Sequence, residues 1–327
     1  VFRARAPRDR RRSPCARAWP ASVRSVDIKS GYHAETSAAG VALRAMDRIE
    51  HHPRDLDALE RAYALLESPS VVAKLTHIVG KPLESALDKL PEGASRRVHS
   101  AVRAALTRSA RVALGSLRDD PSVSASTRSH TLMSAASGAA GGFFGFAGLL
   151  VELPVTTTII LRSIADIARS EGFSVQDPTV AQDCVAVFAL GGPSGDDDAS
   201  ESGYYATRVM LSEVLRQTTA ALTKSAAAGA GQQGISTVSA GKAGVWLAKL
   251  IEAVASRFGV VVTHKFAAQL MPVIGAASGA AVNTLFIRHY QDMARGHFII
   301  RRLEDAYGTE AVQATYTGMR RRLQAPA

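Results

Sequence analysis

The feature that most constrains this chain is an apolar stretch of 24 residues at 138–161, GAAGGFFGFAGLLVELPVTTTIIL. It contains one formal charge, Glu152, and one proline, Pro154. Five glycines lie in its first half, and each glycine costs an exposed helix interior about 1 kcal/mol relative to alanine. Such a density indicates that helix backbones approach one another closely, either in a membrane or in a tightly packed bundle.

Pro154 predicts a break in this segment, because proline has no N–H and its ring clashes with the preceding helical turn. The two pieces would then span only about 24 Å each, less than the ~30 Å hydrocarbon core of a bilayer. We therefore expect a helix, a break and a second helix that either dips into one leaflet or packs inside a bundle. Glu152, beside the break, is either a buried functional acid or a capping or paired carboxylate.

A second segment near the end of the chain has the same design. Residues 272–283, PVIGAASGAAVN, again combine a proline, a run of alanines and two glycines four apart, Gly275 and Gly279. In the first segment the corresponding pair is Gly138 and Gly142. Small residues at this spacing form a flat stripe on a helix, and two such stripes favour pairing with each other. GxxxG spacing alone does not separate a soluble bundle from a membrane interface.

Three motifs carry a resemblance to a known family. They are GAAGGFFGFAGLLVELPVTTTIILRSIADIARSEG from residue 138, CVAVFAL from residue 184, and PVIGAASGAAVNTLFIRHYQDMARGHFIIRRLE from residue 272. Together they resemble the EcsC family of bacterial proteins, over residues 93–308. The resemblance implies a helical fold and membrane association, since the founding member is encoded beside the subunits of an ABC transporter. The family has no established biochemical function, so the resemblance assigns no catalytic residue.

The composition indicates an all-α fold. Apolar residues make up 46% of the 327 positions while aromatic residues make up only 6%, which favours closely packed helices built from alanine, valine and leucine. Strand signals are scarce. Proline and glycine positions predict helices near 37–50, 54–67, 70–79, 82–90, 95–117, 121–136, 139–153, 155–170, 178–190, 204–227, 237–257, 260–271, 273–306 and 309–323. We expect a multi-helix bundle with two Gly/Ala-rich, proline-interrupted segments.

The net charge of +10 is concentrated at the start of the chain. Residues 1–24 hold eight arginines against one aspartate, which leaves only +3 on the other 303 residues. The folded part is therefore not expected to bind nucleic acid. Because this head has no apolar periodicity, we expect residues 1–30 to be a disordered extension, included through a misplaced start, and residues 31–325 to form one domain. A lipid-binding basic tail and a transit peptide are the alternatives.

Localisation follows from the cysteines and from the lack of an export signal. Cys15 and Cys184 are the two cysteines, too few for a disulfide framework, so we expect a reducing compartment. The head lacks the apolar core of a secretory signal. We therefore expect a protein on the cytoplasmic side with peripheral or re-entrant membrane association.

Catalytic signatures are weak. There is no G-x-S-x-G elbow and no P-loop, and we expect no metal or cofactor. His289 and His297 are eight residues apart, too far along one helix to bind one metal. A polar stripe including Asn283 and His289, with His264 from the preceding helix, is the weak catalytic candidate; helix packing is its alternative.

Two functions remain open from the sequence. The favoured one is a membrane-associated accessory protein that contacts the lipid surface and subunits of an ABC transporter. The alternative is a membrane-surface hydrolase that uses Glu152 with His289 or His297. Whether the chain is an enzyme stays undecided, and the residues favour the accessory protein. Gly138, Gly142, Pro154, Gly275, Gly279 and Asn283 are expected to serve packing.

Overall fold

The computed structural model describes residues 49–79, 82–88, 90, 92–114, 125–143, 145–190, 203–225, 242–269 and 275–324. The expected N-terminal extension and Pro272 lie outside these residues. The described part is almost entirely helical and contains no strand, so the all-α prediction is confirmed. Its elements are α2 (Pro53–Leu66), α3 (Val71–Val79), α4 (Pro82–Asp88), α5 (Ala94–Leu114), α6 (Thr127–Phe143), α7 (Gly145–Ser170), α8 (Pro178–Ala186), η2 (Val187–Ala189), α9 (Gly203–Ser225), α10 (Lys242–Gln269), α11 (Gly275–Tyr307) and α12 (Thr309–Gln324).

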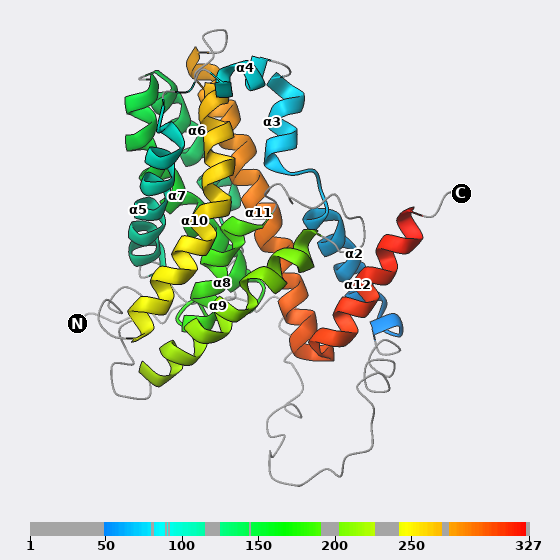
Figure 1. Cartoon of the computed structure of the whole chain (residues 1–327). Coiled ribbons are helices and arrows are strands. Elements are labelled where there is room, and N and C mark those ends of the chain that lie inside the picture. The colour runs from blue at the N-terminus through cyan, green and yellow to red at the C-terminus, as the bar shows by residue number, and fades with distance from the viewer. Residues whose placement is uncertain are drawn as a thin grey trace, which may run out of the picture.

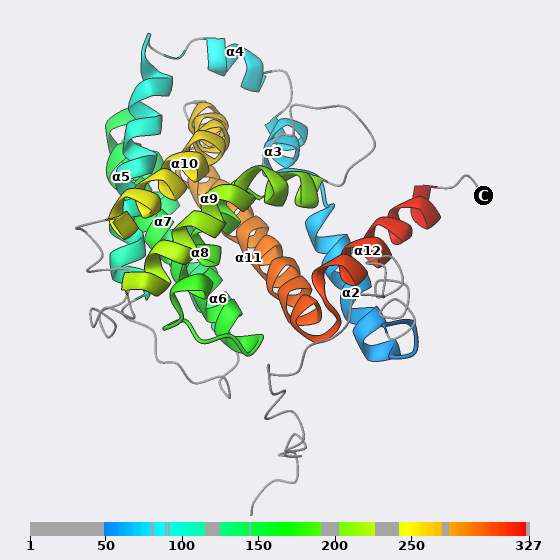
Figure 2. The same ribbon diagram turned by 60° about the horizontal axis from the view of Figure 1, so that its bottom comes forward.

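Helix α11 forms the centre of the bundle. Its 33 residues give it a length of about 50 Å. In both views it lies between α5, α6 and α7 on one side and α2 and α12 on the other (Figures 1 and 2). It packs against α6, α7, α2 and α12. Its inward side chains, among them Phe286, Tyr290 and Phe298, are buried, so α11 joins the two halves of the core.

Several predicted helix ends are confirmed by their capping geometry. The carboxylate of Asp177 accepts a hydrogen bond from the backbone N–H of Thr179 at 2.8 Å, and Pro178 occupies the first turn of α8. This is the expected N-cap followed by proline. Gly308 separates α11 from α12 with φ of 88°, a left-handed conformation that glycine adopts without strain.

The predicted break at Pro154 is wrong. Helix α7 continues from Gly145 to Ser170 with Pro154 inside it. Proline removes one hydrogen bond from the helix, but α7 is packed against α5, α6 and α11, and such packing supplies most of a helix's stability in a protein. In the next turn the hydroxyl of Thr158 donates to the carbonyl oxygen of Pro154 at 2.7 Å. The predicted gap between residues 257 and 260 is wrong as well, since α10 runs through Gly259.

The two Gly/Ala-rich stripes meet where α6 crosses α11. A Cβ atom added at Gly138 would overlap the backbone carbonyl oxygen of Gly279 and would lie 2.5 Å from Nδ2 of Asn283. Gly142 lies one turn further along α6, and Gly275 is the first residue of α11. A similar approach joins α11 to α2, where a Cβ at Gly296 would lie 2.6 Å from Cγ of Leu66. The backbone of α11 is thus approached closely on two sides.

We predict that Gly138→Ala destabilises the protein by about 1–3 kcal/mol, because the new methyl group must push apart two backbones rather than a flexible side chain. Gly318→Ala in α12 is the matched control, since an added Cβ there meets no atom within 4 Å. That control should be neutral or stabilising by up to about 1 kcal/mol. Thermal melts of both variants test this, and equal melting temperatures would contradict the close approach.

Candidate functional site

A buried polar cluster surrounds Glu152, in the middle of the apolar segment. Oε1 of Glu152 accepts hydrogen bonds from Nζ of Lys265 at 3.0 Å, from Nδ2 of Asn283 at 2.7 Å and from the hydroxyl of Thr156 at 3.0 Å. Nδ2 of Asn283 also donates to the backbone carbonyl of Ser134 at 2.9 Å. These residues belong to α7, α10, α11 and α6. The carboxylate therefore links α7, α10 and α11, and Asn283 extends the cluster to α6.

The cluster is shielded from water, so its two charged groups lose the stabilisation that solvent would give them. Lys265 is 1% exposed and Glu152 5%. Burial lowers the pKa of Lys265 below its ordinary value, and the charge of Glu152 opposes that shift. The ammonium group also lies 5.4 Å from the centre of the Phe286 ring, which is within range of a cation–π contact. Of the two interpretations of Glu152, the structure shows the paired carboxylate.

Two acceptor atoms of the cluster have no hydrogen-bond partner among the described residues. They are Oε2 of Glu152 and Oδ1 of Asn283. The amide NH₂ group of Asn283 faces two acceptors, Ser134 O and Glu152 Oε1, and these contacts orient the side chain. Buried acceptors of this kind usually bind a water molecule or tolerate a residual desolvation cost. The cluster is buried, and Oε1 of Glu152 holds both the Thr156 hydroxyl and the Lys265 amine in place.

The candidate histidines do not join Glu152. His264 is half-buried on α10, and its Nδ1 lies 2.9 Å from the carbonyl oxygen of Val260. His289 and His297 lie on α11, six and fourteen residues after Asn283, which places them about 9 and 21 Å further along the helix axis. The residues named for the hydrolase alternative therefore occupy separate places in the bundle.

His289 is buried without a polar partner. It is 1% exposed, and neither ring nitrogen has a hydrogen-bond partner among the described residues. Burial and the nearby charge of Lys74 lower its pKa from 6.5 to about 3, so the ring is neutral near pH 7. The sequence left two interpretations of this residue, a catalytic polar stripe and helix packing, and its surroundings are those of a packed core side chain.

A second buried cluster ties the start of α6 to α7. The carboxylate of Asp166 pairs with Arg169, with 2.5 Å between Oδ1 and the guanidinium nitrogen, and accepts from the backbone N–H of Ser126 at 2.5 Å. Nε2 of His130 lies 3.8 Å from the same carboxylate. Desolvation lowers the pKa of His130, and Asp166 opposes the shift. This arrangement anchors the α6–α7 pair.

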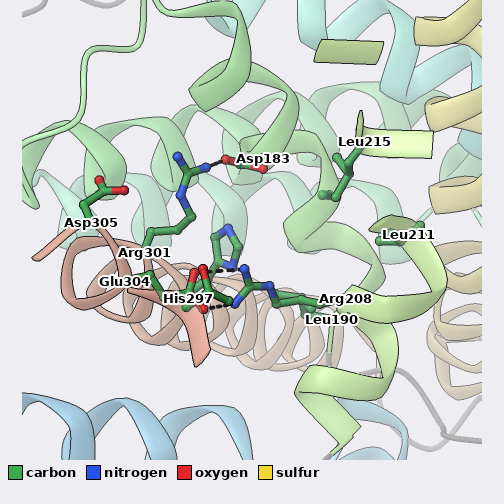
Figure 3. Close-up of a pocket in the computed structure, with 11 residues that line it drawn as sticks. Asp183, Leu190, Arg208, Leu211, Leu215, His297, Arg301, Glu304 and Asp305 are labelled. Atoms are coloured by element: carbon green, nitrogen blue, oxygen red, sulfur yellow. Dashed lines mark hydrogen bonds and ion pairs between the residues drawn. The ribbon is translucent and has the colours of Figure 1, made fainter. Parts of the chain in front are cut away.

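The third polar region lines a cavity of about 270 Å³ between α8, α9, α11 and the start of α12. Figure 3 shows two ion pairs in its wall, Arg208 with Glu304 and Arg301 with Asp183, and His297 between them. The first pair is bidentate, with nitrogen–oxygen distances of 2.6 and 2.9 Å. Arg301 and Asp305 are four residues apart on α11, a spacing typical of surface ion pairs, yet Arg301 pairs with Asp183 of α8. No sequence signal connects residues so far apart.

His297 is the most deeply buried of the polar residues in this wall, followed by Asp183 and Glu304. Its Nδ1 lies 3.0 Å from the hydroxyl of Tyr204, and burial, with the charge of Arg208, lowers its pKa to about 3. Nε2 has no hydrogen-bond partner among the described residues. Within those residues no group of three or more histidine, cysteine, aspartate or glutamate side chains could hold a metal ion.

These observations define an all-α bundle with buried ion pairs and a polar cavity. A sequence model of the EcsC protein family matches residues 54–303. The chain belongs to the EcsC protein family, since this match covers more than half of its length. Comparison with curated proteins and with solved structures found no match. Among the described residues, none of the helices is both long enough and apolar enough to cross a membrane.

We predict that Lys265→Met lowers the free energy of unfolding by about 3–5 kcal/mol, because it leaves the carboxylate of Glu152 buried without a counter-charge. Adding Glu152→Gln to this variant should restore part of the loss. Arg216→Met is the matched control, since it breaks the exposed Arg216–Glu213 pair and should leave the melting temperature almost unchanged. A double variant as unstable as the sum of the two single variants would contradict the coupling.

The buried histidines predict acid sensitivity. His289 and His297 have pKa values of about 3 in the folded protein, against ~6.5 in an unfolded chain. The unfolded chain therefore binds more protons between pH 3 and 6.5, so stability rises with pH across this window, by about 1.4 kcal/mol per pH unit for each histidine.

Denaturant melts of His289→Phe between pH 4 and 7 test this directly. The variant should lose the contribution of one histidine, so its stability should change less steeply with pH than that of the unchanged protein. His264→Phe, at a half-buried position, is the control. A slope identical to that of the unchanged protein would show that His289 is not the titrating group.

Proposed function

We propose that this EcsC family protein is an accessory protein of the membrane surface, bound peripherally on the cytoplasmic side through the α6–α7 pair. It acts through helix contacts with a membrane partner rather than through catalysis. The partner class suggested by the family resemblance is the membrane subunit of an ABC transporter. The observation that carries the proposal is the exposed apolar surface of α6 and α7.

Exposed large apolar side chains occur on both helices of this pair. Leu132 and Met133 of α6 are 72% and 55% exposed, and Val155 of α7 is 51% exposed. The helices pack against each other, and the hydroxyls of Ser137 and Thr156 lie 3.3 Å apart between them. Val155 directly precedes Thr156, the contact residue of α7, and lies on the same helix pair as the α6 side chains. Exposed apolar surface of this kind is typical of an interaction or membrane-contact region.

Charge at the same end of α6 supports a lipid surface over a purely apolar partner. Arg128 is exposed one helical turn before Leu132. Apolar side chains beside an arginine match the boundary of an anionic bilayer, where the side chains enter the acyl region and the guanidinium contacts headgroups. Since the Asp166 and Glu152 clusters hold α6 and α7 from the inner side, the α6–α7 pair can present its outer face without losing its packing.

We predict that Leu132→Gln combined with Met133→Gln weakens binding to vesicles of phosphatidylcholine and phosphatidylglycerol by roughly tenfold, since two apolar side chains no longer leave water. The measurement is co-sedimentation of the full chain with vesicles. Val209→Gln combined with Met210→Gln is the matched control, because these residues of α9 are 62% and 52% exposed.

Two results would overturn the proposal. One is equal binding by the two double variants. The other is complete release of the protein from membranes by high salt without carbonate, because that outcome would assign attachment to charge alone. Co-purification with transporter subunits from detergent-solubilised membranes tests the partner, and it should be lost in the Leu132 and Met133 variant but kept in the control.

A further inference from the structure

The wall of the cavity between α8, α9, α11 and α12 combines charged groups with apolar side chains. We propose that it binds a small zwitterion with an apolar tail, the chemical class of the free apolar α-amino acids. This site goes beyond the membrane-surface function and shares no residue with the α6–α7 contact. The proposal rests on three features of the wall: a fixed hydrogen-bond donor, an unpaired carboxylate and a patch of leucines.

The donor is Nε2–H of His297. NH1 of Arg208 lies 3.4 Å from the hydroxyl oxygen of Tyr204, and an arginine can only donate. The Tyr204 hydroxyl therefore has its hydrogen free to donate to Nδ1 of His297, 3.0 Å away. A neutral imidazole that accepts at Nδ1 carries its proton at Nε2. Nε2–H thus belongs to a side chain that lines the cavity and is 5% exposed, and no described residue accepts a hydrogen bond from it.

The charges of the wall disfavour a simple anion. Three carboxylates face two guanidinium groups across the lining, and two of the carboxylates, Glu304 and Asp183, are already paired with Arg208 and Arg301. Asp305 is the third, and none of the ion pairs among the described residues includes it. An incoming carboxylate can bind Nε2–H of His297 beside Arg301, but it adds negative charge near Asp305. A ligand that also carries an ammonium group removes that cost, because the ammonium pairs with Asp305.

The leucines of the lining determine what kind of tail the ligand carries. Leu190, Leu211 and Leu215 line the cavity, and Figure 3 shows Leu211 and Leu215 at one end, Asp305 at the other and His297 between them. The ammonium, carboxylate and side chain of an α-amino acid branch from one carbon, so the three groups can point toward Asp305, His297 and the leucines at the same time. The volume of about 270 Å³ is small for a ligand site, so the tail must be short. Leucine is the natural probe.

Titration calorimetry of L-leucine into the full chain tests the site. We expect binding with a dissociation constant of about 1 mM or below. Isocaproate, which lacks the ammonium group, and isoamylamine, which lacks the carboxylate, should each bind at least about tenfold more weakly than leucine, because each leaves one charged contact of the wall unmade. Absence of leucine binding up to about 10 mM, or equal binding of isocaproate and leucine, would overturn the proposal.

Single-residue variants test each proposed contact between the wall and the ligand. Asp305→Asn should weaken leucine binding about tenfold, because the ammonium group loses its partner. Isocaproate has no ammonium group, so its binding should not weaken and should gain from the loss of the negative charge near its carboxylate. Asp305 is exposed, so this change should not affect folding, and Asp57→Asn, at an exposed position of α2, is the control for the lost charge. His297→Phe keeps an aromatic ring but removes Nε2–H, and should weaken leucine and isocaproate alike. Identical leucine binding by the Asp305 and Asp57 variants would refute the site, whatever the vesicle experiments show.

Discussion

The contact between the backbones of α6 and α11 is the constraint on which the rest of the structure depends. Gly138 leaves no space for a Cβ atom beside the carbonyl oxygen of Gly279. Because the helices come this close, the side chain of Asn283 can reach both the carbonyl of Ser134 on α6 and the carboxylate of Glu152 on α7. The bridge that Asn283 makes between α6 and the Glu152 cluster therefore depends on the close approach of the two glycine stripes.

Helix α11 carries this arrangement to the rest of the molecule. Its first half holds Asn283 in the glycine contact, and its second half holds Gly296 against α2 and His297 in the cavity wall. A continuous helix keeps these groups at fixed distances, about 1.5 Å per residue. The proposed lipid contact and the proposed ligand site consequently share a scaffold while they use different side chains, and loss of one does not require loss of the other.

The fold class and many helix ends could be read from the sequence because their causes are local. The Asp177–Pro178 cap and the turn at Gly308 depend on a few neighbouring residues. The helix through Pro154 could not be read, because its stability comes from α5, α6 and α11, which are distant in sequence. Glycine spacing indicated that two stripes would pair, and Gly138 does lie against Gly279.

The candidate sites were harder to read than the fold. Glu152 attracted attention as a lone charge in an apolar run, but its partner Lys265 lies 113 residues away, and no local pattern connects them. The same holds for Arg301, whose local partner would be Asp305 and whose actual partner is Asp183. The ion-pair spacing rule for helices describes pairs worth only about 0.2–0.5 kcal/mol. A tertiary contact with a buried carboxylate easily outweighs such a preference.

The Glu152–Lys265 pair also bears on the register in which helices with glycine and alanine stripes pack together. Stripes of glycine and alanine form smooth helix surfaces without protruding side chains. Two packings that differ by a shift of one helical turn therefore gain nearly the same dispersion energy. A buried ion pair adds little net stability, because desolvation offsets most of the attraction. Any shifted packing, however, would separate Glu152 from Lys265 and Asn283 and leave a charge buried without partners, at a cost of several kcal/mol. We infer that the cluster specifies the register of α6, α7, α10 and α11, while the glycines supply their close approach.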